Sequence, residues 1–204
     1  MIVIINYGMG NLHSVINKLH RIDAHAKISS DIADIEKADK LILPGVGFFA
    51  TGMQNIRKSG YLDALNKKVL KDKAPILGIC LGMQLLADHS DEGNAKGLGW
   101  IKGDVKRFSF GKQPGLKIPH MGWNDLAIKR ECPILNGVPK DAEFYFVHSY
   151  HFIDRESGSV VATTRYGYDF PSVVQKGNIF GVQFHPEKSH KDGMTILKNF
   201  AGLR

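Results

Sequence analysis

A cysteine between two glycines is the group in this chain whose setting most directly predicts chemistry. The motif G-I-C-L-G-M-Q at 78–84, which contains Cys80 between two glycines, follows the apolar run 75–77 and precedes residues 85–87, which can continue as a helix. A nucleophile at a sharp strand-to-helix turn, flanked by glycines, is the nucleophile-elbow pattern, here with sulfur in place of oxygen. The glycines permit the tight turn, and a helix N-terminus favours the thiolate. The pattern indicates a nucleophilic Cys80; a buried structural cysteine is the alternative.

A second segment, G-V-Q-F-H-P-E at 181–187, contains a matching base. Alternating apolar residues predict a half-buried strand over 179–184 that ends at His185. The following proline favours an extended His185, and side chains two apart in an extended segment point the same way, so Glu187 follows His185. A thiol nucleophile needs a base, and the base needs a third group that orients it. Alone, His185 and Glu187 would be an ordinary histidine and a solvated carboxylate; together with the elbow they predict a Cys80, His185 and Glu187 triad.

These two motifs together resemble the class I, or triad, glutamine amidotransferases. The segments N-Y-G-M-G-N at 6–11, L-P-G-V-G at 43–47, P-H-M-G-W-N at 119–124 and Y-F-V-H-S-Y at 145–150, in this order, resemble the glutaminase subunits of imidazole glycerol phosphate synthase. The resemblance runs from about residue 2 to about residue 200. It implies glutamine hydrolysis through a thioester on Cys80, with no cofactor. It also implies that ammonia passes through an internal channel to a cyclase partner, a (β/α)₈ barrel of histidine biosynthesis, and that the two subunits form a heterodimer.

The resemblance also implies roles for residues around the triad. The backbone N–H groups of Val46 and Leu81 would form an oxyanion hole, after a flip of the 44–47 segment that its glycines make inexpensive. Gln84 lies one helical turn after Cys80 and faces the same way. The implied substrate-binding residues are Gly45, Gly47, Gln84, His148, Ser149 and Tyr150. The implied partner interface contains Asn11, Met121, Trp123, Tyr145 and Lys188. Alternatives remain open: Gln84 as an exposed helix residue, 144–152 as one core strand, and Met121 and Trp123 as core.

The elements that must position these residues alternate between strand and helix. Apolar spacing predicts strands over 2–5, 25–28, 41–43 and 75–79, and helices over 12–22, 31–36 and 61–71. Such alternation is typical of an α/β fold with a mostly parallel central sheet and helices on both faces, which the resemblance makes flavodoxin-like. Short runs in the second half predict antiparallel additions, at 103–108, 144–152, 159–166, 172–176 and 179–184. A closing helix is expected over 192–201.

Composition limits the remaining possibilities. A chain of 204 residues is expected to form a single domain, 1–204, with a sufficient core. It has two cysteines, no Cys-x-x-Cys and no zinc-type histidine spacing, so we expect neither a disulfide framework nor a metal site. The net charge of +7 comes from scattered lysines, which argues against a nucleic-acid partner. With no leader and no long apolar segment, we expect no membrane contact and a cytoplasmic location.

Two further features bear on function. Gly8-Met9-Gly10 follows a strand, but the third glycine of a dinucleotide fingerprint is replaced by His13, so a nucleotide cofactor is not expected. Phe48 stands where the resembled family more often has a small residue or histidine. This departure favours an alternative, a paralogous branch that supplies ammonia for amino-sugar synthesis in a surface-polysaccharide pathway. Two alternatives of another class are a different cysteine hydrolase, such as a peptidase or thioesterase, and a catalytically silent scaffold subunit.

Overall fold

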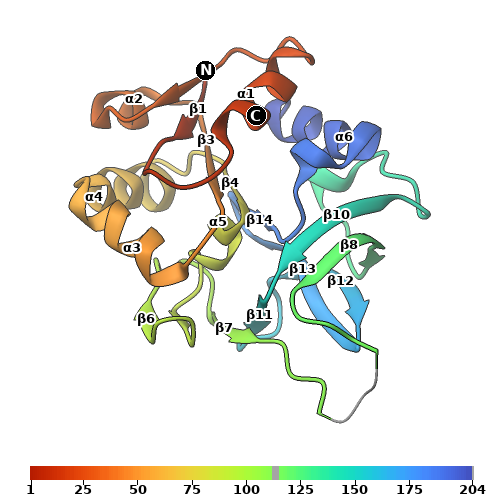
Figure 1. Ribbon diagram of the computed structural model, residues 1–204. Helices are drawn as coiled ribbons and strands as arrows, with labels where there is room; N and C mark the ends of the chain where they lie inside the picture. The colour runs from red at the N-terminus through yellow and green to blue at the C-terminus, as the bar shows by residue number, and fades with distance from the viewer. Residues whose placement is uncertain (112–114, 204) are drawn as a thin grey trace.

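An eight-stranded sheet forms the centre of the computed structural model, which describes residues 1–111 and 115–203 (Figure 1). The sheet is parallel from its first edge to the fifth strand, and the strand order of this half is that of flavodoxin-like folds. In spatial order its parallel strands are β2 (Ala26–Ser29), β1 (Ile2–Ile5), β3 (Lys40–Gly45), β4 (Ile76–Cys80) and β14 (Ile179–Val182). The antiparallel strands β13 (Tyr168–Lys176), β12 (Val160–Tyr166) and β9 (Ala127–Ile128) continue it.

Helices cover both faces of the parallel half, as predicted. In β1, Ile2 and Ile4 join the core under one set of helices, whereas Val3 and Ile5 join the core under the other. This division follows from the two-residue period of a strand. The first face carries α1 (Leu12–His20) and α6 (His190–Ala201). The second carries α2 (Ile32–Lys37), α3 (Phe49–Lys58), α4 (Tyr61–Asn66) and the π-helical turn η1 (Lys67–Lys71).

Two small sheets lie beside the carboxyl ends of β3, β4 and β14. One is the antiparallel pair of β8 (His120–Asp125) and β10 (Glu143–His148). The other has the order β11 (Tyr150–Asp154), β7 (Gly103–Arg107), β5 (His89–Ser90) and β6 (Ala95–Lys96). The chain passes from the first small sheet to the second at Ser149. The run predicted at 144–152 is therefore two strands, because each half pairs with a different partner.

One helix was missed, and two further expectations about elements were wrong. Helix α3 was not predicted, because Phe48 precedes it without a side-chain cap and Gly52 interrupts it. The helix after Cys80, α5 (Leu81–Gln84), ends before residues 85–87. The run 179–184 was expected to be half-buried and an antiparallel addition. Strand β14 is instead fully buried, because it lies between β4 and β13, and it pairs parallel with β4.

Two short 3₁₀ turns, η2 (Pro133–Leu135) and η3 (Pro186–Lys188), complete the elements. Within 1–111 and 115–203, no helix combines the length and the apolar character needed to span a bilayer.

Candidate active site

Cys80 occupies a strained turn between β4 and α5. Its φ and ψ are 54° and −109°, in a region that residues with a Cβ rarely adopt. The turn depends on the flanking glycines: a Cβ on Gly78 would lie 2.6 Å from the carbonyl oxygen of Gly82, and one on Gly82 would lie 1.7 Å from that of Leu43. Strain of this kind concentrates at functional sites. The predicted nucleophile elbow is thus present in the backbone geometry, although the helix behind it has only four residues.

His185 and Glu187 meet beside this turn, both almost fully buried. The ring Nδ1 of His185 lies 2.8 Å from Oε1 of Glu187. The local geometry differs from the expected one: His185 is extended, but Glu187 belongs to the 3₁₀ turn η3, which brings its carboxylate back to the ring. Among the described residues, Nε2 of His185 has no hydrogen-bond partner. That nitrogen is therefore free to exchange a proton with a neighbouring group.

The pKa of His185 reflects two opposing influences. Burial lowers it, but interactions with the Cys80 thiolate and with the Glu187 carboxylate outweigh burial and raise the pKa to about 10. A charged His185 beside the Cys80 sulfur and the Glu187 carboxylate is the arrangement that activates a thiol nucleophile. Cys80, His185 and Glu187 are thus brought together as predicted.

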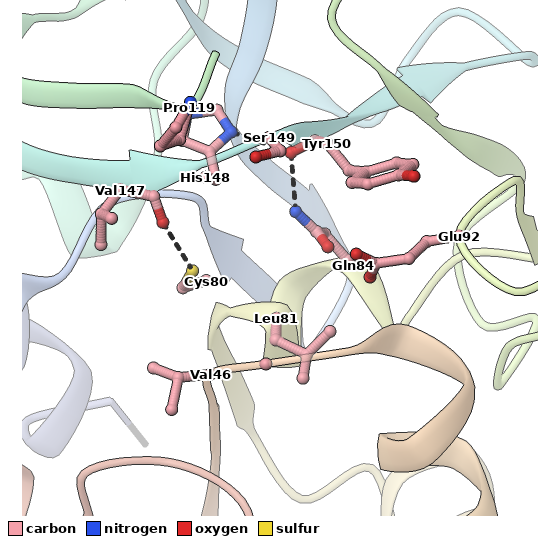
Figure 2. Close-up of a pocket in the computed structure, with 11 residues that line it drawn as sticks. Val46, Cys80, Leu81, Gln84, Glu92, Pro119, Val147, His148, Ser149 and Tyr150 are labelled. Atoms are coloured by element: carbon pink, nitrogen blue, oxygen red, sulfur yellow. Dashed lines mark hydrogen bonds between the residues drawn. The ribbon is translucent and has the colours of Figure 1, made fainter.

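A cavity of about 310 Å³ opens over Cys80 (Figure 2). Val46 and Leu81 lie on one side of the sulfur, and the 147–150 segment lies on the other. The cavity is lined by Val46, Gly47, Cys80, Leu81, Gln84, Glu92, Pro119, Val147, His148, Ser149 and Tyr150. All of the expected substrate and oxyanion residues except Gly45 therefore reach it.

Gly45 does not line the cavity, but it lies in close contact with Tyr7 and Leu81. A Cβ there would lie 2.5 Å from the hydroxyl oxygen of Tyr7 and 2.9 Å from Cβ of Leu81. Tyr7 is buried, and its hydroxyl donates a hydrogen bond of 2.7 Å to the carbonyl of Pro44. Burial, and then the charge of Cys80, raise the pKa of Tyr7, so the phenol stays a donor. Tyr7 thus anchors the start of the predicted oxyanion segment, a role that no spacing pattern in the sequence indicated.

Gln84 is buried, not exposed as in the open alternative. Its Nε2 donates 2.8 Å to the carbonyl of Tyr150 and 3.1 Å to Oε1 of Gln183 (Figure 2). Gln183 in turn places its own Nε2 3.8 Å from Sγ of Cys80. Gln183 was not singled out in the sequence, although it lies in the same motif as His185.

Glu92 is a second lining residue that the sequence did not reveal. Its carboxylate accepts a hydrogen bond of 2.8 Å from the backbone N–H of Phe49 and thereby caps α3, 43 residues away along the chain. Burial raises its pKa, and this hydrogen bond opposes the shift. An acidic group at the rim of this cavity suits a substrate ammonium group. It was missed because its segment, 91–94, has no pattern beyond that of a turn.

Two buried histidines, His120 and His148, form a chain of hydrogen bonds that holds the 148–150 segment in place. Nδ1 of His148 lies 2.8 Å from the carbonyl of Tyr150, which can only accept, so His148 donates there. Nε2 of His148 must then accept from Nδ1 of His120, 3.0 Å away, and Asn124 donates to the other nitrogen of His120. Burial lowers the pKa of His120 to about 4 and that of His148 well below its usual value. Both rings are therefore neutral and held in one tautomer.

The expected interface residues form a surface cluster near the same site. Met121 and Trp123 are 61% and 43% exposed and lie on β8, so they are surface residues and not core. Trp123 pairs with Tyr145 of β10, and Nζ of Lys188 lies 5.4 Å from the centre of the Tyr145 ring. Asn11 is exposed and caps α1, which packs against η3. Four of the five residues are thus contiguous, and Asn11 lies across η3 from them.

No group of three or more His, Cys, Asp or Glu side chains suited to a metal ion occurs in the described part of the chain. Cys80 and Cys132 are both free and buried.

Comparisons with known proteins agree with this geometry. The family model described as glutamine amidotransferase class-I matches residues 3–202. The chain is 49% identical to imidazole glycerol phosphate synthase subunit HisH 2 of Pseudomonas aeruginosa over the whole of both chains. It is 48% identical to the subunit of that name from Methanococcus maripaludis, over 98% of each. A crystal structure of a glutamine amidotransferase superposes with a TM-score of 0.72 at 24% identity, over 98% of this chain and 99% of the other, which supports the fold. The chain therefore belongs to the class-I glutamine amidotransferase family and, within it, groups with the HisH subunits.

Proposed function

We propose that this chain is the glutaminase subunit of an imidazole glycerol phosphate synthase, and that Cys80, His185 and Glu187 hydrolyse glutamine to glutamate and ammonia. The observation that carries the proposal is the strained Cys80, which lines a cavity of about 310 Å³ and lies beside a buried His185–Glu187 pair. A cavity of this size suits a small amino acid, and its polar rim suits the charged end of one.

The reaction follows from the placement of the groups. The Cys80 thiolate attacks the side-chain amide carbon of glutamine, and the backbone N–H groups of Val46 and Leu81 stabilise the oxyanion. His185 gives its proton to the departing nitrogen, the C–N bond breaks, and ammonia leaves while the γ-glutamyl group remains on Cys80 as a thioester. His185 then takes a proton from water, whose oxygen attacks the thioester and releases glutamate. Glu187 holds the ring of His185 in position and stabilises its charged form throughout.

The remaining residues bind the substrate. Gln84 and the backbone of His148, Ser149 and Tyr150 hold the amino-acid end, with Glu92 as a partner for its ammonium group. Gly47, with a φ of 108°, and Gly45 give the oxyanion segment the freedom to rotate a peptide.

Ammonia released into water is protonated and lost as a nucleophile, so we propose direct transfer to a (β/α)₈-barrel cyclase subunit. It would dock on the surface formed by Met121, Trp123, Tyr145 and Lys188, with Asn11 nearby. We further propose one domain over 1–204. A cytoplasmic location suits an enzyme that depends on a reduced thiol, Cys80.

The test is glutamate release from glutamine by the purified chain alone, with a histidine-pathway cyclase subunit, and with that subunit plus a ribotide ligand. We expect a rise only in the complete mixture, and none with Cys80→Ala. We propose that the isolated chain is nearly inactive because the partner and its ligand must first set the oxyanion segment, and strong turnover by the isolated chain would contradict this.

No rise with a competent cyclase would contradict the histidine-pathway assignment and favour the amino-sugar acceptor, to which the exposed Phe48 already pointed. A panel of peptide and thioester substrates, hydrolysed faster than glutamine, would favour another cysteine hydrolase. Glutamine-dependent product formation by Cys80→Ala would favour a silent scaffold.

A further inference from the structure

Gln183 is a buried polar side chain beside the nucleophile to which the proposed mechanism assigns no role. It follows β14 directly, its side chain is fully buried, and its backbone N–H donates 2.9 Å to the carbonyl of Ser172. Its amide lies between two residues of the site, with Oε1 3.1 Å from Nε2 of Gln84 and Nε2 3.8 Å from Sγ of Cys80. Burial of an amide group lowers the stability of the fold unless the amide makes hydrogen bonds.

The direction of this hydrogen-bond chain is determined at one end by a backbone carbonyl. The carbonyl of Tyr150 can only accept, so the amide atom of Gln84 that faces it, 2.8 Å away, must be the NH₂ nitrogen. The same nitrogen lies against Gln183, whose facing atom must therefore be its oxygen. The NH₂ group of Gln183 is thus the end that faces Cys80, and it is a donor only.

Besides His185, whose charge also favours a thiolate, the sulfur has a further neighbour, and its character is opposite to that of Gln183. The carbonyl of Val147 lies 3.9 Å from Sγ of Cys80 and can accept from a thiol S–H, but it repels a thiolate (Figure 2). The N–H of Gln183 does the reverse, because it is attracted to a thiolate more strongly than to a neutral thiol. The two contacts therefore distinguish the protonation states of Cys80.

We propose that Gln183 is a further catalytic residue, whose Nε2–H donates to the Cys80 thiolate and stabilises the nucleophile before substrate binds. Through Oε1 it also couples the orientation of Gln84, a substrate-binding residue, to the state of the sulfur. This inference rests on the proposed nucleophilic role of Cys80, but it does not depend on which acceptor receives the ammonia.

The test is the pH dependence of Cys80 alkylation by chloroacetamide in the full chain, followed by peptide-resolved mass spectrometry. Gln183→Met keeps the volume and removes the donor. Loss of one charge-assisted hydrogen bond should move the midpoint of the acid limb up by about one pH unit, so that alkylation below the midpoint is about 10-fold slower. Gln183→Asn, which withdraws the amide by one methylene, should shift the profile in the same direction.

Two controls separate this effect from damage to the fold. Ser172→Ala removes a fully buried donor on the neighbouring strand, whose hydroxyl bonds to the carbonyl of Ala162, and should leave the profile in place. Cys132 is free and buried, and its alkylation in the same sample reports opening of the structure. If faster alkylation of Cys132 shows that Gln183→Met has opened the structure, the pH profile of Gln183→Asn tests the proposal instead.

An acid limb that coincides with that of the unsubstituted chain in a folded Gln183 variant would overturn the proposal. The experiment uses neither glutamine nor a partner, so it is independent of the turnover assay. If a Gln183 variant shifts the acid limb but no cyclase subunit activates the chain, the role of Gln183 stands and only the histidine-pathway assignment is rejected.

Discussion

At the scale of single residues, the site depends on which groups carry charge. His185 lies against Glu187 in a setting where burial alone would discharge the ring, and the two anionic neighbours reverse that tendency. A buried charge pair is weak evidence for added stability, but breaking it by removing one partner is strongly unfavourable. The pair therefore ties activity and stability to the same two side chains.

The variant Glu187→Gln tests this link. It removes the carboxylate and offers the ring an amide, which destabilises the charged form and its orientation, so kcat for glutamine should fall by about 10²- to 10⁴-fold. The pKa of His185 is raised from 6.5 to about 10 in the folded chain, so the stability it contributes is complete below pH 6.5 and is lost as the pH rises toward 10. Chemical denaturation from pH 6 to 10 should show this decline in the unsubstituted chain and a shallower one in Glu187→Gln. Equal slopes would contradict the assignment.

Acid should destabilise the fold through the opposite kind of residue. His120 is buried and neutral, with its pKa lowered from 6.5 to about 4. Between these pH values its ring is therefore protonated in the unfolded chain but not in the folded chain. Stability from this group is present above pH 6.5 and falls as the pH drops toward 4. His120→Leu should remove on the order of 2 kcal/mol of the acid-induced loss between these limits, measured as the free energy of unfolding. It also leaves Nε2 of His148 without its donor, so the variant should be less stable at neutral pH. An unchanged acid slope would mean that His120 is charged in the folded state.

At the scale of elements, the elbow depends on close contact between β3 and α5. Gly82→Ala would place a methyl group 1.7 Å from the carbonyl oxygen of Leu43, which belongs to a central strand that cannot move away. We expect a loss of more than about 3 kcal/mol in the free energy of unfolding, or no soluble folded chain. The matched control is Gly158→Ala, where nothing lies within 4 Å of the added atom and φ is ordinary. Similar melting temperatures for both variants would show that α5 can move away from β3 at Gly82 without loss of stability, which would contradict this expectation.

Sequence patterns predicted the elements with strong local signals and missed those set by distant partners. The capped helix α2, with Asp31 accepting from Ala33, and the apolar strands of the parallel half were predicted within a few residues. Helix α3 escaped because its cap is Glu92, a residue far along the chain. The triad was predictable because its three residues lie in two recognisable motifs, and the resemblance extended the prediction to the cavity wall. Tyr7 and Glu92 were not predictable in this way, since only the tertiary structure brings them to the site. Gln183 lies in the same motif as His185, but no pattern in the sequence indicated that its side chain reaches Cys80.

At the scale of the whole molecule, the two most relevant exposed apolar side chains are Met121 and Trp123, which lie two residues apart on β8. Met121 and Trp123 lie on one face of the β8–β10 pair, next to Tyr145, whose carbonyl accepts from the backbone N–H of His185. Large exposed apolar residues in one place commonly mark an interaction surface. A partner seated there would contact the backbone that positions His185, which gives docking a direct route to the proposed site.

Trp123→Ala is the sharpest test of that surface. A partly exposed tryptophan at the centre of an interface commonly contributes 2 kcal/mol or more, so the Kd for the cyclase subunit, measured by titration calorimetry, should rise about 30-fold or more. Folding should change little, because the side chain is 43% exposed. The matched control is Ile128→Ala on β9, 44% exposed and outside the cluster, which should bind as the unsubstituted chain does. Equal weakening by both variants, or none by either, would place the partner on another face. If binding weakens while glutaminase activity at saturating partner is retained, the surface serves docking alone; if activity is lost as well, the strand pair also transmits the partner's effect to His185.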